Sequence, residues 1–168
     1  STAASAWEFF TPKNGWMVQA NSARETYRYT GGAWEIFYQE GTWTPTLYGS
    51  TTAGTNTYSV QAGIYVRVGN TCYIAMSITL SAKDAAMAGQ ARIGGLPFSQ
   101  DTSINQTLNV SSWTGITLDA GRTAVSISSA GTYLFFSESG SGVSVGSLDA
   151  PMFSSTAAFR IGGTFKIA

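Results

Sequence analysis

The side chains that most often perform acid–base or metal chemistry are scarce in this sequence. It contains no histidine and a single cysteine, Cys72. The lack of histidine removes the usual general base and the commonest metal ligand, and one cysteine cannot build a structural zinc site. We therefore predict no cofactor, no metal site and no catalytic residue of these types, which leaves paired carboxylates as the remaining route to catalysis.

Paired carboxylates are sufficient for glycoside hydrolysis, which needs two Asp or Glu side chains roughly 5–9 Å apart. The candidates are Asp84, Asp101, Asp119, Glu138 and Asp149. Their spacing marks no two of them as a pair, and the aspartates lie in turn-like or loop-like segments, where such residues commonly bond to the backbone. Structural roles are the favoured interpretation, and a small glycan depolymerase is kept as an alternative.

Aromatic side chains in a hydroxyl-rich sequence indicate binding more strongly than catalysis. Sugars stack their C–H faces on flat rings, while hydroxyl and amide groups satisfy their polar edges. Trp113, flanked by serine and threonine, is the best candidate for a glycan contact, and Tyr133, Tyr58 and Tyr48 follow. The alternative for Trp113 is a place in the core or in a subunit interface.

The charge balance excludes several classes of partner. Lys and Arg number 9 against 9 Asp and Glu, so the net charge is zero and nothing predicts binding to nucleic acid or to an anionic membrane. No apolar run approaches the ~20 residues of a membrane span. Only 11% of residues are charged, which suits a chain that packs on copies of itself.

The ends and the cysteine content bear on where the chain folds. A lone cysteine cannot form an intrachain disulfide, so folding in a reducing cytoplasm is allowed. The N-terminus lacks a basic segment followed by an apolar stretch, so no export signal is recognised. The sequence starts at Ser1 within what reads as continuing sequence, and we expect a fragment of a longer chain.

Alternating apolar and polar residues predict an all-β fold. The clearest strand covers 71–80, and residues 64–68 alternate in the same way, with a tight turn between the two. Further strands are expected at 57–61, 91–93, 107–110, 115–118, 124–128, 132–137 and 158–167. Roughly ten short strands separated by Gly or Pro indicate a sandwich or barrel. Residues 82–88 are the one segment with helical character, about two turns ended by Gly89.

The N-terminal residues 1–41 differ in being dense in aromatic side chains. Strand-like segments at 27–30 and 33–36 flank Gly31 and Gly32, which can supply the positive φ angles of a type I′ hairpin turn. Because an isolated hairpin is only marginally stable, these aromatics need a surface to pack on. We predict a connector or neck over 1–41, packed on neighbouring chains or on the main domain, and a β-sandwich tip domain over 42–168.

Three segments form distinctive motifs: a Gly-Thr-Trp-Thr-Pro opening at 41–45, a Gly-x-Tyr-x-Arg-x-Gly strand at 63–69 and a Gly-Leu-Pro-Phe turn ending at Phe98. In combination they resemble a C-terminal module of phage tail fibres and tailspikes. The resemblance implies a homotrimeric β-sandwich of jelly-roll type that recognises a cell-surface glycan or stabilises the fibre's trimer. In themselves the motifs favour a scaffold role: Pro45 would keep its strand at a sheet edge, and Arg67 could pair across strands.

These observations lead to one hypothesis and two alternatives. The hypothesis is a non-enzymatic tip on the virion tail that trimerises, joins the upstream part of a fibre or spike, and binds a host surface polysaccharide. The first alternative is a purely structural trimerisation or folding clamp, and the second is the glycan depolymerase. We expect a stable homotrimer, because the weakly charged sequence and the aromatic N-terminal hairpin would leave apolar surface exposed on a monomer.

Overall fold

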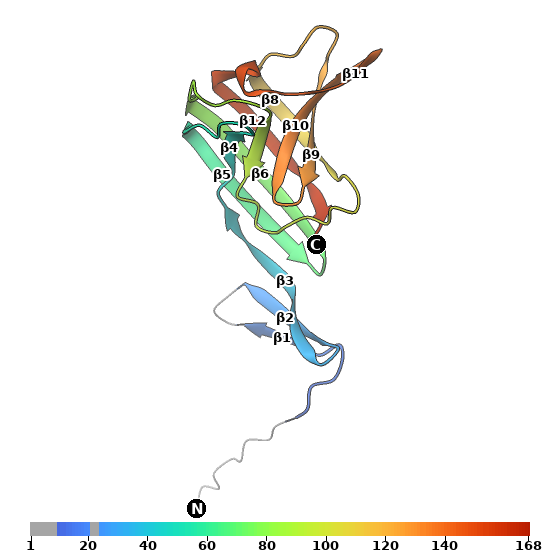
Figure 1. Ribbon diagram of the computed structural model, residues 1–168. Helices are drawn as coiled ribbons and strands as arrows, with labels where there is room; N and C mark the ends of the chain where they lie inside the picture. Colours follow the sequence, from blue (N-terminus) through green and yellow to red (C-terminus); the bar gives the residue numbers. More distant parts are fainter. Residues whose placement is uncertain (1–9, 21–23) are drawn as a thin grey trace, which may run out of the picture.

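The protein is described by a computed structural model that covers residues 10–20 and 24–168. Nearly all of its regular structure is antiparallel β-strand (Figure 1). The strands are β1 (Met17–Ala20), β2 (Glu25–Thr30), β3 (Ala33–Trp43), β4 (Thr46–Gly49), β5 (Thr57–Val68), β6 (Thr71–Ala82), β7 (Ala91–Gly94), β8 (Thr107–Ile116), β9 (Ala124–Ala130), β10 (Tyr133–Gly140), β11 (Val143–Ser147) and β12 (Phe153–Lys166). A short 3-10 turn, η1 (Ala150–Met152), is the one helical element in these residues, and no helix there could cross a membrane.

The strands form one curled sheet whose two halves face each other. We call β3, β5, β6, β12 and β8 sheet A, and β8, β9, β10, β7 and β4 sheet B. β8 belongs to both, because Thr107 and Leu108 pair with β9 while the rest of the strand pairs with β12. β11 pairs with β10 outside this order. The predicted all-β antiparallel sandwich is confirmed.

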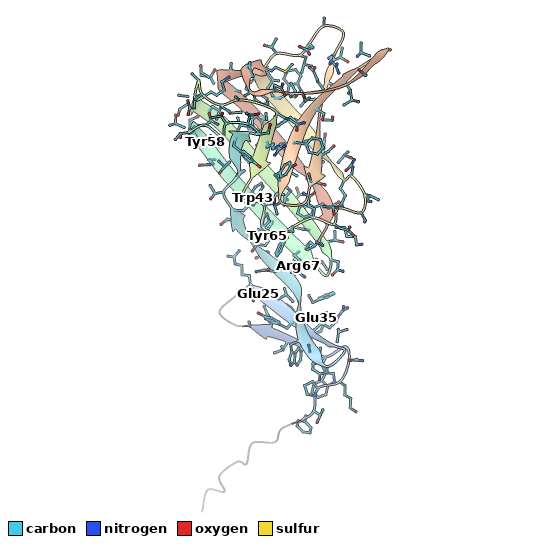
Figure 2. The ribbon with its side chains drawn as sticks, in the orientation of Figure 1. Glu25, Glu35, Trp43, Tyr58, Tyr65 and Arg67 are labelled. Carbon is cyan, nitrogen blue, oxygen red and sulfur yellow. The ribbon has the colours of Figure 1, made fainter. Side chains whose placement is uncertain are left out.

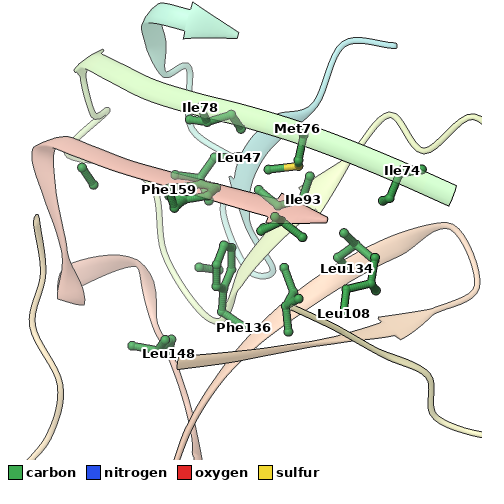
Figure 3. Close-up of a cluster of buried hydrophobic side chains, with 14 of the residues drawn as sticks. Leu47, Ile74, Met76, Ile78, Ile93, Leu108, Leu134, Phe136, Leu148 and Phe159 are labelled. Carbon is green, nitrogen blue, oxygen red and sulfur yellow. The ribbon is translucent and has the colours of Figure 1, made fainter. Parts of the chain in front are cut away.

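The core lies between the two halves of the sheet. Alternate side chains of β6 point into it and are at most 5% exposed: Cys72, Ile74, Met76, Ile78 and Leu80. Sheet B contributes buried side chains from the other side, among them Ile93 and Leu134 (Figure 3). Phe136, Phe153 and Phe159 contact one another edge to face, with ring centroids 5.1–6.2 Å apart. This packing makes both sheets rigid supports for their outer faces.

The Gly-Thr-Trp-Thr-Pro motif forms part of this scaffold. Trp43 is buried, and its indole Nε1 donates a hydrogen bond of 3.3 Å to the carbonyl of Ile64. The ring lies against the backbone of Gly63, where a Cβ would stand 2.4 Å from Nε1. Glycine is therefore favoured at this position in β5, because a side chain would take space that the indole occupies.

The other motif residues also pack locally. Tyr65 meets Phe98 edge to face at 5.4 Å, and the Arg67 guanidinium lies 5.1 Å from the centroid of the same ring. Figure 2 shows Tyr65 and Arg67 on the part of the sandwich nearest to β2. Arg67 also donates to the carbonyl of Gly69 at 2.9 Å. Arg67 was expected to pair across strands, but its polar contact is with its own turn. These contacts give the motif residues a structural role in the fold.

Side chains of β5 and of the segment before it form hydrogen bonds with backbone groups at the free edge of β4. Pro45 precedes this edge strand, as predicted, and β4 pairs with β7 alone. The Tyr58 hydroxyl accepts a hydrogen bond from the backbone N–H of Leu47 at 3.1 Å and lies 3.3 Å from its carbonyl, while Asn56 donates to that carbonyl. Gln61 donates to the carbonyl of Pro45. These bonds satisfy backbone groups that an open edge would leave unpaired.

β1, β2 and the first part of β3 form a stem that projects from the sandwich (Figure 1). Gly31 and Gly32 have φ angles of 61° and 98°, which confirms the predicted hairpin turn. β3 pairs with β2 at one end and with β5 at the other, so it runs through the predicted boundary between residues 41 and 42. Within the described residues, none before Trp43 is buried. The division into a neck over 1–41 and a tip domain over 42–168 remains a prediction.

The predicted helical segment at 82–88 is wrong. β6 extends to Ala82, and the Asp84 carboxylate then accepts the N–H groups of Thr55 and Ala86, which fixes a turn instead of a helix. Ala88 exchanges two backbone hydrogen bonds with Thr52. The predicted strands at 57–61 and 64–68 are one strand with register shifts, and those at 107–110 and 115–118 merge in β8. The short strands β1 and β11 were not predicted.

Candidate binding site

Tyr48 and Tyr133 lie on the outer face of sheet B. Tyr48 in β4 is opposite Arg92 in β7, and Arg92 is opposite Phe135 in β10. Paired residues share a face of a sheet, and Tyr133 shares that of Phe135 because it is two positions away. The residues that alternate with them point into the core: Leu47, Ile93 and Leu134. The fold therefore brings together two of the predicted glycan-contact residues and adds Arg92 between their strands.

The Arg92 guanidinium stacks on Tyr133, with its Cζ 4.2 Å from the ring centroid. Its side chain makes no hydrogen bond or ion pair with the described residues, and its Nε is buried without an acceptor. The Tyr48 ring lies beside Gly94, where a Cβ would stand 3.1 Å from the ring. We call Tyr48, Arg92 and Tyr133 the aromatic–arginine cluster. It combines two rings with a cation whose hydrogen-bonding capacity is unused.

Neither of the other predicted contact residues lies in this cluster. Tyr58 faces the seam between β5 and β4, and burial raises the pKa of its hydroxyl. Trp113 is half-buried against the core and opposite Phe159 in the register of β8 with β12. The core alternative therefore describes its surroundings better than an exposed platform does. Its part in glycan binding remains a prediction.

The outer face of sheet A has a different character. Several of its large apolar side chains are 42–52% exposed: Val60, Ile64, Val68 and Tyr73. A shallow groove lies beside them. The residues that line it include Tyr73, Asn109, Arg160 and Gly162. Exposed apolar side chains gathered on one sheet face are typical of surfaces that meet another chain.

Glu138 is the most enclosed of the candidate acids. Its side chain is fully buried, and its Oε1 lies 3.0 Å from Nε of Arg122, which is 14% exposed. Its Oε2 accepts the backbone N–H of Asp119 at 3.0 Å. The Arg122 guanidinium also donates to the carbonyls of Glu138 and Ser144. This ion pair ties the loop before β9 to the β10–β11 hairpin, and its carboxylate is out of reach of a substrate.

The carboxylates of Asp84, Asp101 and Asp149 also have structural contacts, whereas Asp119 is held through its backbone groups. Backbone hydrogen bonds from Ala86 and Thr55 hold the pKa of Asp84 below its usual value, which confirms a turn-capping role. Asp101 accepts hydrogen bonds from Lys166 and from the N–H of Ser103, and these bonds lower its pKa well below the ordinary range. Asp149 accepts a hydrogen bond from Ser147.

The described residues contain no cluster of three or more acidic or cysteine side chains suited to a metal ion.

Arg92 is the residue of the candidate site that sequence reasoning missed. Arg92 lies in a strand of four residues, Ala91–Gly94, and the sequence shows only that it alternates with apolar residues, which the structure buries. Arg92 could have been found only by knowing that β7 pairs with both β4 and β10. These pairings join residues more than 40 positions apart in the sequence.

A comparison with solved structures found one with a similar fold. The crystal structure of the Dettilon tailspike protein matches this chain with a TM-score of 0.61 and 20% sequence identity. The match covers 78% of this chain and 24% of the tailspike, so this chain spans about a quarter of that protein's length. At this identity the match shows a shared fold. A scan against models of protein families found no match, and a search of curated proteins found none.

Proposed function

We propose that this chain is the trimeric tip of a phage tail fibre or tailspike, located on the virion tail, and that it binds a host surface polysaccharide. The aromatic–arginine cluster carries this proposal. Its rings lie on a solvent-facing sheet surface, where they can stack on sugar C–H faces while the Arg92 guanidinium donates to sugar oxygens. The likeness to the Dettilon tailspike fold supports the tail location.

The test is binding of labelled protein to host cells and to their purified surface polysaccharide. Tyr133→Leu keeps much of the side-chain volume but removes the flat ring, and we expect it to weaken binding at least tenfold. Tyr133→Phe is the matched control, because it keeps the ring and its contact with Arg92. Equal binding by Tyr133→Leu and the parent protein would refute a role for this face.

The proposal includes binding without cleavage. It is supported by the contacts of the candidate acids, above all the burial of Glu138 against Arg122. The depolymerase alternative predicts release of reducing ends from the bound polysaccharide. An assay of reducing ends over time separates the two, because steady release by purified protein would show that a carboxylate is catalytic.

A second candidate function is purely structural trimerisation of a longer fibre. It is favoured by the stem, where Trp16, Met17, Val18 and Trp34 are 40–55% exposed in the single chain. A narrow β-ribbon with apolar side chains in solvent is not stable alone, so it needs copies of itself to pack on. The exposed apolar residues of sheet A extend this surface through β3.

Sedimentation of an Ile64→Asp variant tests the trimer. Ile64 is 52% exposed in the single chain, so a charge there should be tolerated by a monomer but should disrupt a subunit interface. Val145→Asp is the control, because Val145 is 69% exposed on β11. We expect the control to sediment as a trimer and Ile64→Asp to dissociate. A monomeric parent protein at micromolar concentration would refute trimerisation, and a trimer without polysaccharide binding would favour the structural function.

A further inference from the structure

We infer that the aromatic–arginine cluster binds an anionic sugar, with the Arg92 guanidinium pairing with its negatively charged group. The inference rests on the proposed glycan-binding function and adds the chemical class of the ligand. It starts from the state of Arg92, whose charge is held against the Tyr133 ring without a carboxylate partner among the described residues.

The charge of Arg92 is not neutralised by its neighbours in sheet B. β4, β7 and β9 contain no acidic residue. The one acid of β10, Glu138, is buried on the core side and paired with Arg122. Asp149 bridges to Gln90, two positions before Arg92, but its carboxylate accepts a hydrogen bond from Ser147. The face therefore presents an uncompensated cation.

The geometry of the guanidinium suits an external oxyanion. Its Nε is the only side-chain nitrogen of Arg92 that is both buried and without an acceptor, so the two Nη atoms keep contact with solvent. The Tyr133 ring covers one face of the guanidinium plane, which leaves the Nη edge to donate. A planar guanidinium pairs with a carboxylate or a phosphate through two parallel hydrogen bonds.

The two tyrosines supply the part of the site that recognises a sugar. β7 lies between β4 and β10, so Arg92 has Tyr48 on the strand to one side and Tyr133 on the strand to the other. A sugar ring stacked on either tyrosine would bring a carboxylate on that ring next to the guanidinium. Neutral sugars would gain the stacking but not the ionic pair, and this difference gives specificity for acidic polysaccharides.

The experiment uses the full chain and a panel of acidic bacterial polysaccharides, each paired with its carboxyl-reduced form. A second arm uses phosphate-bearing polysaccharides before and after removal of phosphate, because a guanidinium accepts either anion. For the polysaccharides that the chain binds, in whichever arm they occur, we expect binding to be at least tenfold weaker after the anionic group is removed. We also expect affinity to fall as sodium chloride is raised from about 0.05 to 0.5 M.

Variants link the preference to this cluster. Arg92→Gln should lose the preference for the charged form, and Arg92→Lys should keep only part of it, because lysine lacks the planar fork. Lys13→Gln is the control, since it removes one exposed positive charge that lies before β1 and outside both faces of the sandwich. Circular dichroism is used to check that each variant folds. The Arg92 side chain makes no hydrogen bond with the described residues whose loss would unfold the chain.

The outcomes separate this inference from the proposed function. Binding that is equal for charged and neutralised polysaccharides, or a full preference retained by Arg92→Gln, overturns the anionic-sugar inference and leaves glycan binding standing. Binding to no polysaccharide by the parent protein overturns the proposed glycan-binding function as well. An equal loss of the preference in Lys13→Gln and in Arg92→Gln would show that overall charge sets the preference and would also overturn the inference.

Discussion

Replacing Gly63 with alanine tests how the contact between β5 and the Trp43 indole holds the fold. A Cβ at position 63 would stand 2.4 Å from Nε1 and 2.6 Å from Cε2 of the Trp43 indole. Neither distance is possible for real atoms, so the indole has to move. The displaced ring would lose its hydrogen bond to the carbonyl of Ile64 and part of its burial.

The size of the effect follows from these contacts. Forcing a methyl group into a packed site costs about 1–3 kcal/mol, and the lost indole hydrogen bond costs about 1 kcal/mol. Alanine returns about 0.4–1 kcal/mol because it restricts the unfolded chain more than glycine does. The net loss is roughly 2 kcal/mol, which corresponds to a melting temperature lower by about 4–8 °C in a chain of this size.

Gly162→Ala is the matched control for this substitution. Gly162 lies in β12 of the same sheet, and a Cβ there would meet its nearest atom, the carbonyl oxygen of Ile74, at 3.6 Å. This is ordinary van der Waals contact, so the variant should melt within a degree or two of the parent protein. Thermal unfolding is followed by circular dichroism at one protein concentration. Equal melting temperatures for Gly63→Ala and Gly162→Ala would refute the described packing of Trp43.

Three further predictions concern residues singled out in the sequence. Trp113→Ala should lower stability by about 2–3 kcal/mol in urea unfolding, because the half-buried ring loses its contacts with the core beside Phe159. Normal stability with weakened polysaccharide binding would instead favour Trp113 as a glycan contact. Burial raises the pKa of the Cys72 thiol to about 11, so iodoacetamide at pH 8 should modify this cysteine only in unfolded protein. Rapid labelling of the folded protein would contradict the burial of Cys72. Lys166 lowers the pKa of Asp101, so the contribution of this carboxylate to stability is present above about pH 4 and is lost as the pH falls further. Asp101→Asn should therefore reduce the loss of stability at acidic pH, and an unchanged plot of stability against pH would exclude this linkage.

The sequence predicts those parts of the fold that local patterns control. The alternation in β6 places its apolar side chains in the core, and the pair of glycines at the tip of the β2–β3 hairpin adopts the positive φ angles expected. The helical reading of 82–88 failed because composition alone cannot show that Asp84 bonds to Thr55, a residue far away in the sequence. Tertiary contacts decided that segment.

The candidate site depends on strand pairing, which the sequence does not display. Tyr48 and Tyr133 were chosen as aromatics in a hydroxyl-rich chain, and nothing in their spacing showed that β7 would join them or that Arg92 would lie between their strands. Tyr58 was chosen for the same reason, yet its hydroxyl bonds to the edge of β4. Residue type indicates which side chains can bind a sugar, and register decides which of them share a face.

The two outer faces of the sandwich suit the two halves of the proposed function. The face of sheet A carries exposed Val60, Ile64 and Val68, and β3 connects it to a stem without a buried residue among those described. The opposite face carries the aromatic–arginine cluster. In a trimer that packs through sheet A and the stem, the cluster of each chain would face outward, so three equivalent glycan sites would act together on one polysaccharide-coated cell. Linked sites bind far more tightly than one site does, which allows each shallow cluster to be individually weak.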